Sequence, residues 1–294
     1  MAVLTAQGIS SLAIELLTRS LVLPNTVSLI PGGEFAGSNG DTITVRVPQP
    51  GSARTQATRG ATITYDDVTE VPVDVELKHL YHGKLVSDEE MTLDLEDFGR
   101  QITRVQVDAV ATAAEDELCG VMNGLSADDS VAANGSDVEE KILEAREFLG
   151  ENDVPAGDRY LAVSPAMATF LLEVDKFVKV NEAGGSGALR DAVLGRLYGF
   201  TIVESNGLDS GTAVAYHRSG FVMGNRVPLA PRGATDSATA TAGGIGLRQV
   251  FQYVPDNLSD ASVVSTFAGA SAVVEDATTV PDVKRFYKLD TSTT

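Results

Sequence analysis

The chain has 294 residues and is 43% hydrophobic, enough apolar material for one large domain or two smaller ones. It carries 22 Lys+Arg against 41 Asp+Glu, and this net charge of −19 excludes nucleic-acid binding through the overall field. A single cysteine, Cys119, excludes internal disulfides and a thiolate metal cluster, and no apolar run reaches the ~18–20 residues of a membrane span.

Residues 1–33 predict an N-terminal arm. Its apolar side chains have helical spacing, and a Pro-Gly-Gly turn follows at residues 31–33. Such a short helix cannot bury its apolar face alone, so we expect the arm to contact mainly other chains. Glu15 lies inside the apolar segment and no basic residue precedes it, which argues against a secretory signal. We therefore expect a soluble protein that is made in the cytoplasm.

Two segments with alternating apolar residues predict a β-hairpin with a long loop. Ile43, Val45 and Val47 form the first alternation, and residues 71–77 form the second. Hairpin loops normally have about 2–5 residues, whereas here residues 48–70 intervene. Their Gly-, Ser- and Thr-rich composition offers little to pack against a core. We therefore expect a projecting loop that contacts mainly other chains.

Opposite charges gather on this loop and on the turn that follows the hairpin. Residues 42–65 contain three arginines and no acid, whereas six acids lie between Asp88 and Asp97. One interpretation is that a helix start collects carboxylates, which favour its exposed N–H groups. The other is that the two segments are complementary across a subunit contact. The candidate inter-subunit residues are Arg54, Arg59, Glu89, Glu90, Asp94 and Asp97.

Residues 92–123 predict one long helix, of roughly 45 Å at about 1.5 Å per residue. It has two apolar stripes, so it should pack on more than one layer and act as a spine. Cys119 lies on this helix and is expected to be a buried, inert thiol. One stripe contains Leu95, Phe98, Ile102, Val105 and Ala109, and the other contains Val107, Val110, Ala114, Leu118 and Val121.

Short helices and strands alternate after the spine and predict a compact α/β block from about residue 125 to 230. A capping box, Ser136-Asp-Val-Glu139, should open one helix, and Ser164-Pro165 should open another. A further helix is expected through Leu189, Val193 and Leu197. The strands predicted in the remaining chain are 160–163, 200–203, 212–216, 220–223, 246–253, 263–267 and 283–287, the last three returning to the sheet beside the spine.

Motifs for catalysis or ligand binding are not recognisable. His79 and His82 stand three apart at the end of a strand, where such residues face opposite sides. The glycines at 184–187 and 243–246 lack the strand–loop–helix frame of a phosphate loop. Ser164 and Ser219 lack a Gly-x-Ser-x-Gly context. We therefore expect no enzyme activity, no catalytic residue, no cofactor and no metal site.

The order of these elements resembles tailed-bacteriophage major capsid proteins of the Hong Kong 97 type. That family has an N-terminal arm, a long projecting hairpin, an acidic turn, a spine helix and an α/β block in the same order. The resemblance covers essentially the whole chain, and particular stretches are similar to actinobacteriophage capsid proteins. These stretches are Val86-Ser-Asp-Glu-Glu-Met91, Leu95-Glu-Asp-Phe98, Leu194-Gly-Arg-Leu-Tyr-Gly-Phe-Thr-Ile-Val203 and Ser262-Val-Val-Ser-Thr-Phe267.

The resemblance implies an α+β, Hong Kong 97-like capsid fold in four parts. Residues 1–33 would be the arm and 34–78 the extended hairpin loop. A peripheral domain would combine residues 79–124, including the spine helix 92–123, with residues 241–294. An α/β axial domain would span residues 125–240.

The implied function is self-assembly into an icosahedral shell of hexamers and pentamers that encloses double-stranded DNA. The protein would be part of the virion and would be assembled in the host cytoplasm, with no membrane and no sequence-specific contact to DNA. Portal, scaffolding and decoration proteins are the other partners that the family implies. The chain departs from the family prototype because it has no lysine before Lys78, so the prototype's loop-lysine cross-link is unavailable. It also starts at the arm, without the scaffolding segment of some members.

Two alternatives stay open at the level of sequence. An encapsulin-type nanocompartment has the same fold and would enclose cargo protein rather than DNA. A small acidic α/β hydrolase is the alternative from another class, and it would be monomeric.

Overall fold

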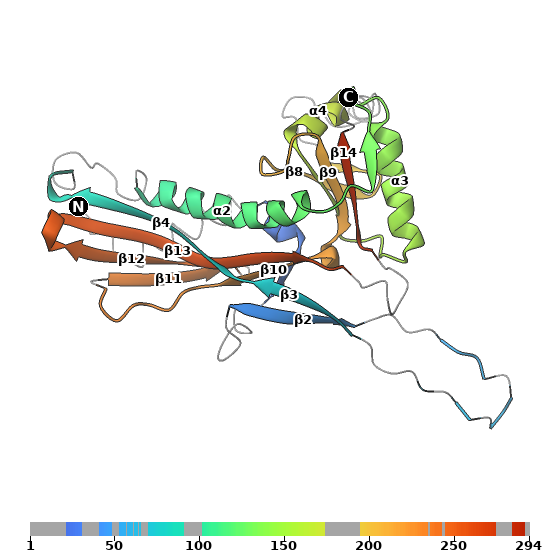
Figure 1. Cartoon of the computed structure of the whole chain (residues 1–294), viewed down its shortest axis with the longest axis horizontal. Coiled ribbons are helices and arrows are strands. Elements are labelled where there is room, and N and C mark those ends of the chain that lie inside the picture. Colours follow the sequence, from blue (N-terminus) through green and yellow to red (C-terminus); the bar gives the residue numbers. More distant parts are fainter. Residues whose placement is uncertain are drawn as a thin grey trace.

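The computed structural model describes residues 22–30, 41–48, 53–56, 58–60, 62–63, 65, 70–90, 102–173, 195–234, 236–242, 245–274 and 284–291. The described part is elongated, with a long sheet and helix α2 toward one end and a second unit of sheet and helices beside them (Figure 1). Helices and strands alternate irregularly along the chain, and antiparallel and parallel strand pairs both occur. The predicted α+β class is confirmed.

The long sheet is built around β13 (Ser259–Ala272). One edge of β13 pairs with β4 (Lys78–Ser87), and the other edge pairs first with β12 (Ile245–Val254) and then with β10 (Phe221–Arg226). The predicted strands at 246–253 and 263–267 are thus confirmed, although the second is much longer than expected.

Two further strands complete this sheet at its outer edges. β11 (Asp236–Ala242) pairs antiparallel with β12, and β1 (Ser28–Ile30) pairs parallel with β10. Before β1, a short 3-10 helix η1 (Leu23–Thr26) is packed into the core, and Leu23 and Val27 are fully buried. The expectation that the arm contacts mainly other chains is therefore wrong for residues 23–30. Residues 1–21 lie outside the described part of the chain.

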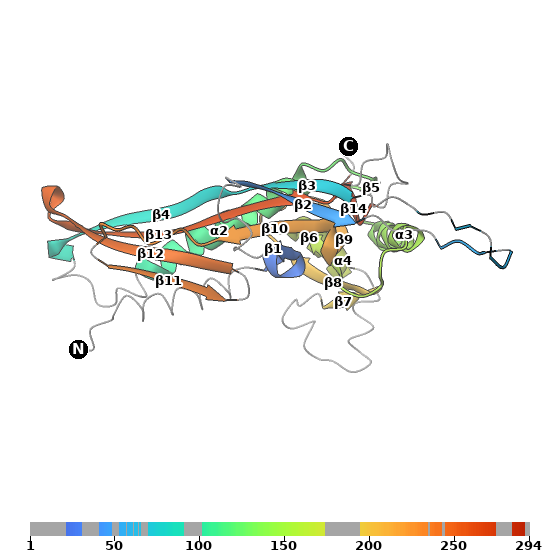
Figure 2. The same cartoon turned by 90° about the horizontal axis from the view of Figure 1, so that it is seen from below.

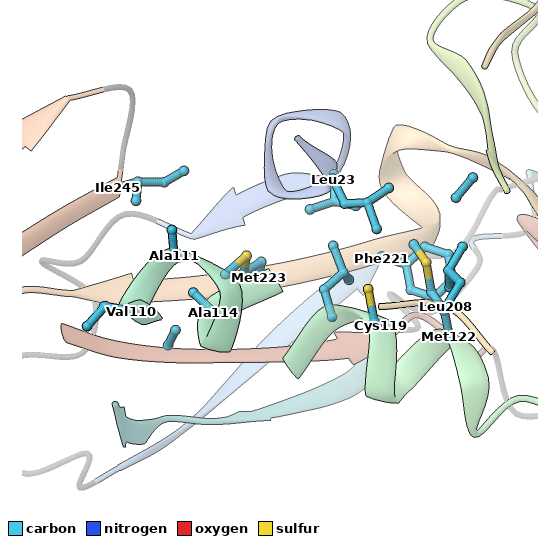
Figure 3. Close-up of a cluster of buried hydrophobic side chains, with 14 of the residues drawn as sticks. Leu23, Val110, Ala111, Ala114, Cys119, Met122, Leu208, Phe221, Met223 and Ile245 are labelled. Carbon is cyan, nitrogen blue, oxygen red and sulfur yellow. The ribbon is translucent and has the colours of Figure 1, made fainter. Parts of the chain in front are cut away.

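Helix α2 (Arg104–Asn123) lies along the long sheet, and its apolar stripe faces the strands. Val107, Val110, Ala114 and Leu118 are buried, as their spacing predicted, and Figure 3 shows Val110 and Ala114 of this face in one cluster with Met223 of β10. The other predicted stripe is only partly buried, because Ile102 is in the core but Val105 is 53% exposed. The predicted helix is confirmed over residues 104–123, and residues 91–101 lie outside the described chain.

A buried polar cluster fastens the first turn of α2 to the sheet. Gln106 is fully buried, and its Nε2 donates to the carbonyl oxygens of Ser262 (2.8 Å) and His82 (3.3 Å). The Ser262 hydroxyl donates back to Gln106 Oε1 at 2.9 Å. Because buried polar groups without partners are costly, these bonds define one position of the helix on β4 and β13.

The second unit contains a six-stranded sheet in the order β5-β14-β9-β6-β8-β7. Helix α3 (Val138–Glu151) packs on it through an apolar stripe that includes Ile142 and Leu149, and α4 (Pro165–Glu173) packs beside it. The predicted strands at 160–163, 200–203 and 212–216 are confirmed. The strands are β5 (Asp129–Val131), β6 (Arg159–Val163), β7 (Arg196–Leu197), β8 (Phe200–Glu204), β9 (Thr212–His217) and β14 (Phe286–Thr291).

Three local predictions in this unit are corrected. The capping box at Ser136 is not formed, since α3 begins at Val138 without a side-chain cap and Glu139 instead accepts a hydrogen bond from the Tyr198 hydroxyl. Leu197, expected at the end of a helix, lies in β7. The last strand, β14, pairs with β5 and β9 rather than joining the sheet beside α2.

The predicted hairpin is confirmed. β2 (Thr42–Pro48) and β3 (Glu70–Glu76) pair in register from Thr42–Glu76 to Pro48–Glu70. The alternation works as expected, because Val73 and Val75 are buried in a cluster with Val222 of the long sheet. The hairpin base crosses β13 so closely that a Cβ atom at Gly269 would overlap the carbonyl oxygen of Glu76.

Candidate assembly surfaces

The far end of the hairpin carries the two candidate arginines. Arg54 and Arg59 are exposed, and in both views the described residues between 53 and 65 lie well beyond the two sheets (Figures 1 and 2). Two apolar side chains are also exposed here, Ile63 at 55% and Tyr65 at 84%. Exposed apolar and cationic groups together are typical of a contact with another protein.

The third arginine of the loop segment has a partner inside the hairpin. Arg46 lies 3.5 Å from Glu70 on the facing strand, and Thr44 donates to Asp74 nearby. The ion pair is largely exposed, so it contributes little to stability. Arg46 therefore lies within the paired strands of the hairpin, whereas Arg54 and Arg59 lie in the loop beyond them.

The acidic turn lies at the opposite end of the molecule, directly after β4 (Figure 1). Glu90 accepts hydrogen bonds from the Ser87 backbone N–H (3.0 Å) and hydroxyl (3.2 Å), and the Glu90 N–H donates to the Ser87 hydroxyl (3.2 Å). This reciprocal pattern is a capping box, and these hydrogen bonds lower the pKa of Glu90. Glu89 is exposed, and Asp94 and Asp97 lie outside the described residues.

Among the described residues of one subunit, the structure therefore does not bring the two arginines together with Glu89 and Glu90. The described loop residues between 53 and 65 lie at one end of the long axis, and the end of β4, which Glu89 and Glu90 follow in the chain, lies at the other (Figures 1 and 2). For Glu90, the capping box shows the local role that the first of the two interpretations predicted. A contact between the two groups requires a second copy of the chain.

The open face of β4 is an apolar surface that sequence reasoning missed. Tyr81 and Leu85 are 71% and 53% exposed, and their spacing places them on one face of the strand. β4 was not predicted as a strand, because its apolar residues Leu80, Leu85 and Val86 do not alternate strictly. The sequence signal for a strand was limited to one aromatic residue, Tyr81, and one β-branched residue, Val86, which are types enriched in strands.

Two potentially reactive side chains, the buried Cys119 and the exposed His79, pack against other residues. Cys119 is 1% exposed, with its Sγ 3.6 Å from the Ser205 hydroxyl, and burial raises the pKa of its thiol to about 11. This matches the buried, inert thiol that was predicted. The His79 ring lies 4.6 Å from that of Phe267, measured between centroids. Within the described residues, no cluster of three or more His, Cys, Asp or Glu side chains could hold a metal ion.

No helix in the described part of the chain combines the length and apolar character needed to cross a membrane.

Comparison with solved structures identifies similar folds. A structure from Mycobacterium phage Che8 is 20% identical, with a TM-score of 0.64 over 92% of this chain and 90% of that one. The capsid of cyanophage P-SCSP1u is 13% identical, with a TM-score of 0.65 over 93% and 89%. A virus-like particle from Pyrococcus furiosus is 13% identical, with a TM-score of 0.57 over 96% and 97%. These likenesses show the Hong Kong 97-like capsid fold that the element order predicted.

Sequence comparison agrees with the fold. No curated protein matches the chain significantly. The model of a family described as phage capsid protein matches residues 83–264, which run from β4 through α2 and the second unit to β13. Since this match spans more than half of the sequence, the chain belongs to the phage capsid protein family.

Proposed function

We propose that copies of this capsid protein assemble into an icosahedral shell of hexamers and pentamers around the double-stranded DNA of a tailed bacteriophage. The observation that carries the proposal is the projecting hairpin. Its far end exposes Ile63 and Tyr65 beyond the body of its own subunit, where only another molecule can cover them. Repetition of that contact around a ring would produce the capsomers.

The charge of the chain fits an enclosure role rather than a DNA-binding role. Because the chain carries a net charge of −19, the inner wall of the shell would not bind the enclosed DNA tightly. The proposal therefore includes no sequence-specific contact to DNA. We infer a structural and non-enzymatic protein of the virion, assembled in the host cytoplasm. Portal, scaffolding and decoration proteins would meet this shell at its outer or inner surface.

The proposed division into domains follows the sequence prediction. The arm would be residues 1–33, the extended loop 34–78, the axial domain 125–240, and the peripheral domain 79–124 with 241–294. The pairing of β13 with β4 on one edge and with β12 on the other supports the joining of the two peripheral segments. Three strands depart from this division. β14 lies in the same sheet as β6 and β9 of the axial segment, whereas β10 and most of β11 come from the axial segment but lie in the long sheet.

We also propose that Arg54 and Arg59 bind acids of the next subunit, chosen from Glu89, Glu90, Asp94 and Asp97. Support comes from the described part of the loop and the end of β4, which lie at opposite ends of the long axis and so suit a contact between successive copies. Arginine suits this contact because its planar guanidinium can bind a carboxylate with two hydrogen bonds. Glu89 is the better candidate of the two described acids, since the Glu90 carboxylate already caps the turn.

Electron microscopy of the purified, expressed protein tests the assembly proposal. Closed shells of uniform diameter are expected. A matched variant in which a two-residue Asn-Gly turn replaces residues 49–69 should keep the folded body but form no shells. A wild-type protein that sediments as a monomer and forms no particles would overturn the proposal and would favour the hydrolase alternative.

The encapsulin alternative is kept because the Pyrococcus virus-like particle matches 96% of this chain, as completely as the phage capsids do. The contents of native particles separate the two functions. Nuclease-protected double-stranded DNA of uniform length supports the phage capsid. Particles that contain a defined protein cargo and no DNA support the nanocompartment.

A further inference from the structure

A pocket of about 460 Å³ lies where the base of the hairpin meets the long sheet. Asp41, Leu77 and His79 line it on the side of the hairpin and β4, and Arg226, Arg248 and Phe267 line it on the side of the sheet. We call it the hairpin-base pocket. The backbone N–H of Leu77 donates to the Asp41 carbonyl oxygen at 2.7 Å, so the hairpin is closed at this point.

The strand register places two arginines at neighbouring positions on one face of the sheet, and both line the pocket. Arg226 of β10 pairs with Phe267, and Arg248 of β12 pairs with Ser265. Paired residues of antiparallel strands point to the same face, and residues two apart on a strand share a face. Both arginines therefore lie on the face of the sheet where the hairpin base sits.

The guanidinium group of Arg248 has hydrogen-bond partners for some of its nitrogens but not for all of them. Its two terminal nitrogens donate to the Leu229 carbonyl oxygen and to the Ser265 hydroxyl (3.1 Å), whereas its buried Nε has no partner among the described residues. Burial lowers the pKa of Arg248, because the charged form has lost water. A buried, charged donor without an acceptor is unfavourable, and native structures rarely leave such a donor without a hydrogen bond.

The lining of the pocket carries more positive than negative charge. Within the described part of the chain, neither Arg226 nor Arg248 forms an ion pair, and Asp41 is the only acid in the lining. A carboxylate is the ligand that suits this lining, since it can accept two hydrogen bonds from one guanidinium and contact the other. A group of this size also fits against the apolar walls that Leu77 and Phe267 provide.

We propose that the hairpin-base pocket receives an Asp or Glu side chain from a second copy of this chain. This inference depends on the proposed shell assembly. Charge complementarity selects the occupant, because every neighbour in such a shell carries 41 acidic residues against 22 basic ones. A nucleic-acid phosphate is a poorer occupant, since the net charge of the chain repels it. The bound carboxylate would hold the hairpin base and the long sheet together as the subunits join.

Assembly of purified subunits tests the proposal through Arg226→Gln, which removes a charge without removing a hydrogen bond to any described residue. The critical concentration for shell formation, measured by light scattering, should rise roughly tenfold, the effect of losing one charge-assisted contact. Arg232→Gln is the matched control, because Arg232 is exposed on the loop after β10. Thermal unfolding of unassembled subunits should be the same for both variants and wild type. Equal critical concentrations for the two variants would overturn the inference.

A second measurement identifies the occupant. A photoreactive residue is placed at Leu229, which lines the pocket and is 81% exposed, and shells are assembled from mixed isotope-labelled and unlabelled subunits. Cross-links between labelled and unlabelled chains, at a peptide containing Asp or Glu, are expected. Cross-links only within a subunit, or only to nucleic acid, would overturn it. If the wild-type protein forms shells and Arg226→Gln assembles equally well, only this inference is rejected. If the wild-type protein forms no shells, the proposed function is rejected as well.

Discussion

Cys119 shows at the scale of one residue how packing decides chemistry. The thiol lies on the buried face of α2, toward Leu208 and Phe221 of the core (Figure 3). The lack of solvent raises the pKa of this thiol to about 11, so at neutral pH it stays protonated and out of reach of reagents. Its spacing on an apolar helix was sufficient to predict this from the sequence.

We expect Cys119 to resist alkylation in the native subunit. At pH 8, iodoacetamide should label the folded protein at least about tenfold more slowly than the same protein in denaturant, because only the thiolate reacts. Mass spectrometry gives the labelled fraction. A Leu229→Cys variant, with its thiol at an exposed position, serves as the positive control. Rapid labelling of Cys119 in folded wild type would contradict the buried environment.

Helix caps show why some residues could be predicted and others could not. Ser164 was predicted as an N-cap, and its hydroxyl accepts from the Met167 N–H at 3.4 Å. A motif that also predicts a helix start failed at Ser136, because one local group and one distant group bind the residues that follow Ser136. Asp137 accepts from the Ala132 N–H (2.8 Å), and Tyr198 donates to Glu139 from 59 residues away. Local sequence contains no signal for such contacts.

Strands were predictable where one face is buried and the other is exposed, as in β3. β4 was missed because strand β13 determines its structure by pairing with it from Lys78 to Ser87. The candidate site shows the same limit. Sequence identified the arginines and acids of the loop and turn, whereas Arg226 and Arg248 came together only through the strand register.

Gly269→Ala tests how closely the hairpin must approach β13. The new Cβ would overlap the Glu76 carbonyl oxygen and meet Leu77 Cα at 3.4 Å, and these backbone atoms can move only if the hairpin shifts. We expect the free energy of unfolding, measured in urea on unassembled subunits, to fall by roughly 1–3 kcal/mol, as in overpacked sites. Shell yield should fall further, because the displaced hairpin points away from its neighbour.

Gly83→Ala is the control for this substitution. It lies in the same sheet, and its new Cβ would meet Val263 Cγ2 at an ordinary 3.5 Å. Shells and unfolding curves like those of wild type are expected for Gly83→Ala. The same result for Gly269→Ala would show that the close crossing is not required.

Across the whole molecule, identical subunits of charge −19 repel each other, so assembly requires local attraction. Arg59→Glu should prevent or slow assembly without unfolding the subunit, and Glu89→Lys should partly rescue it. Each exposed ion pair contributes only about 0.2–1 kcal/mol, but a shell repeats the contact many times. Raising salt should weaken the shell, since the Debye length falls from about 10 Å at 0.1 M to about 3 Å at 1 M.

Arg232→Glu is the matched control for this charge reversal, and light scattering with circular dichroism reports assembly and folding. If Arg54→Ala and Arg59→Ala together leave both assembly and its salt dependence unchanged, the proposed pairing has no structural role.

Purified shells should be held together without covalent bonds. Cys119 is buried, and the chain has no lysine before Lys78 that could form a loop cross-link. Boiling in detergent should therefore give a single band near 30.8 kDa on an electrophoresis gel. A ladder of covalent multimers would refute this expectation. A distinctly smaller single band would reveal proteolytic processing during maturation.

Helix α2 is attached to both halves of the subunit. Near its start, Gln106 is bonded to the long sheet, and at its other end the Asn123 side chain donates to the Gly207 carbonyl oxygen at 3.1 Å and accepts from the Asp209 N–H at 3.1 Å. Over its 20 residues it acts as a stiff beam of about 30 Å. A shell needs subunits in both flat and sharply curved surroundings, yet this beam resists bending between the sheets. We expect curvature to be accommodated outside this helix, at the contacts between subunits.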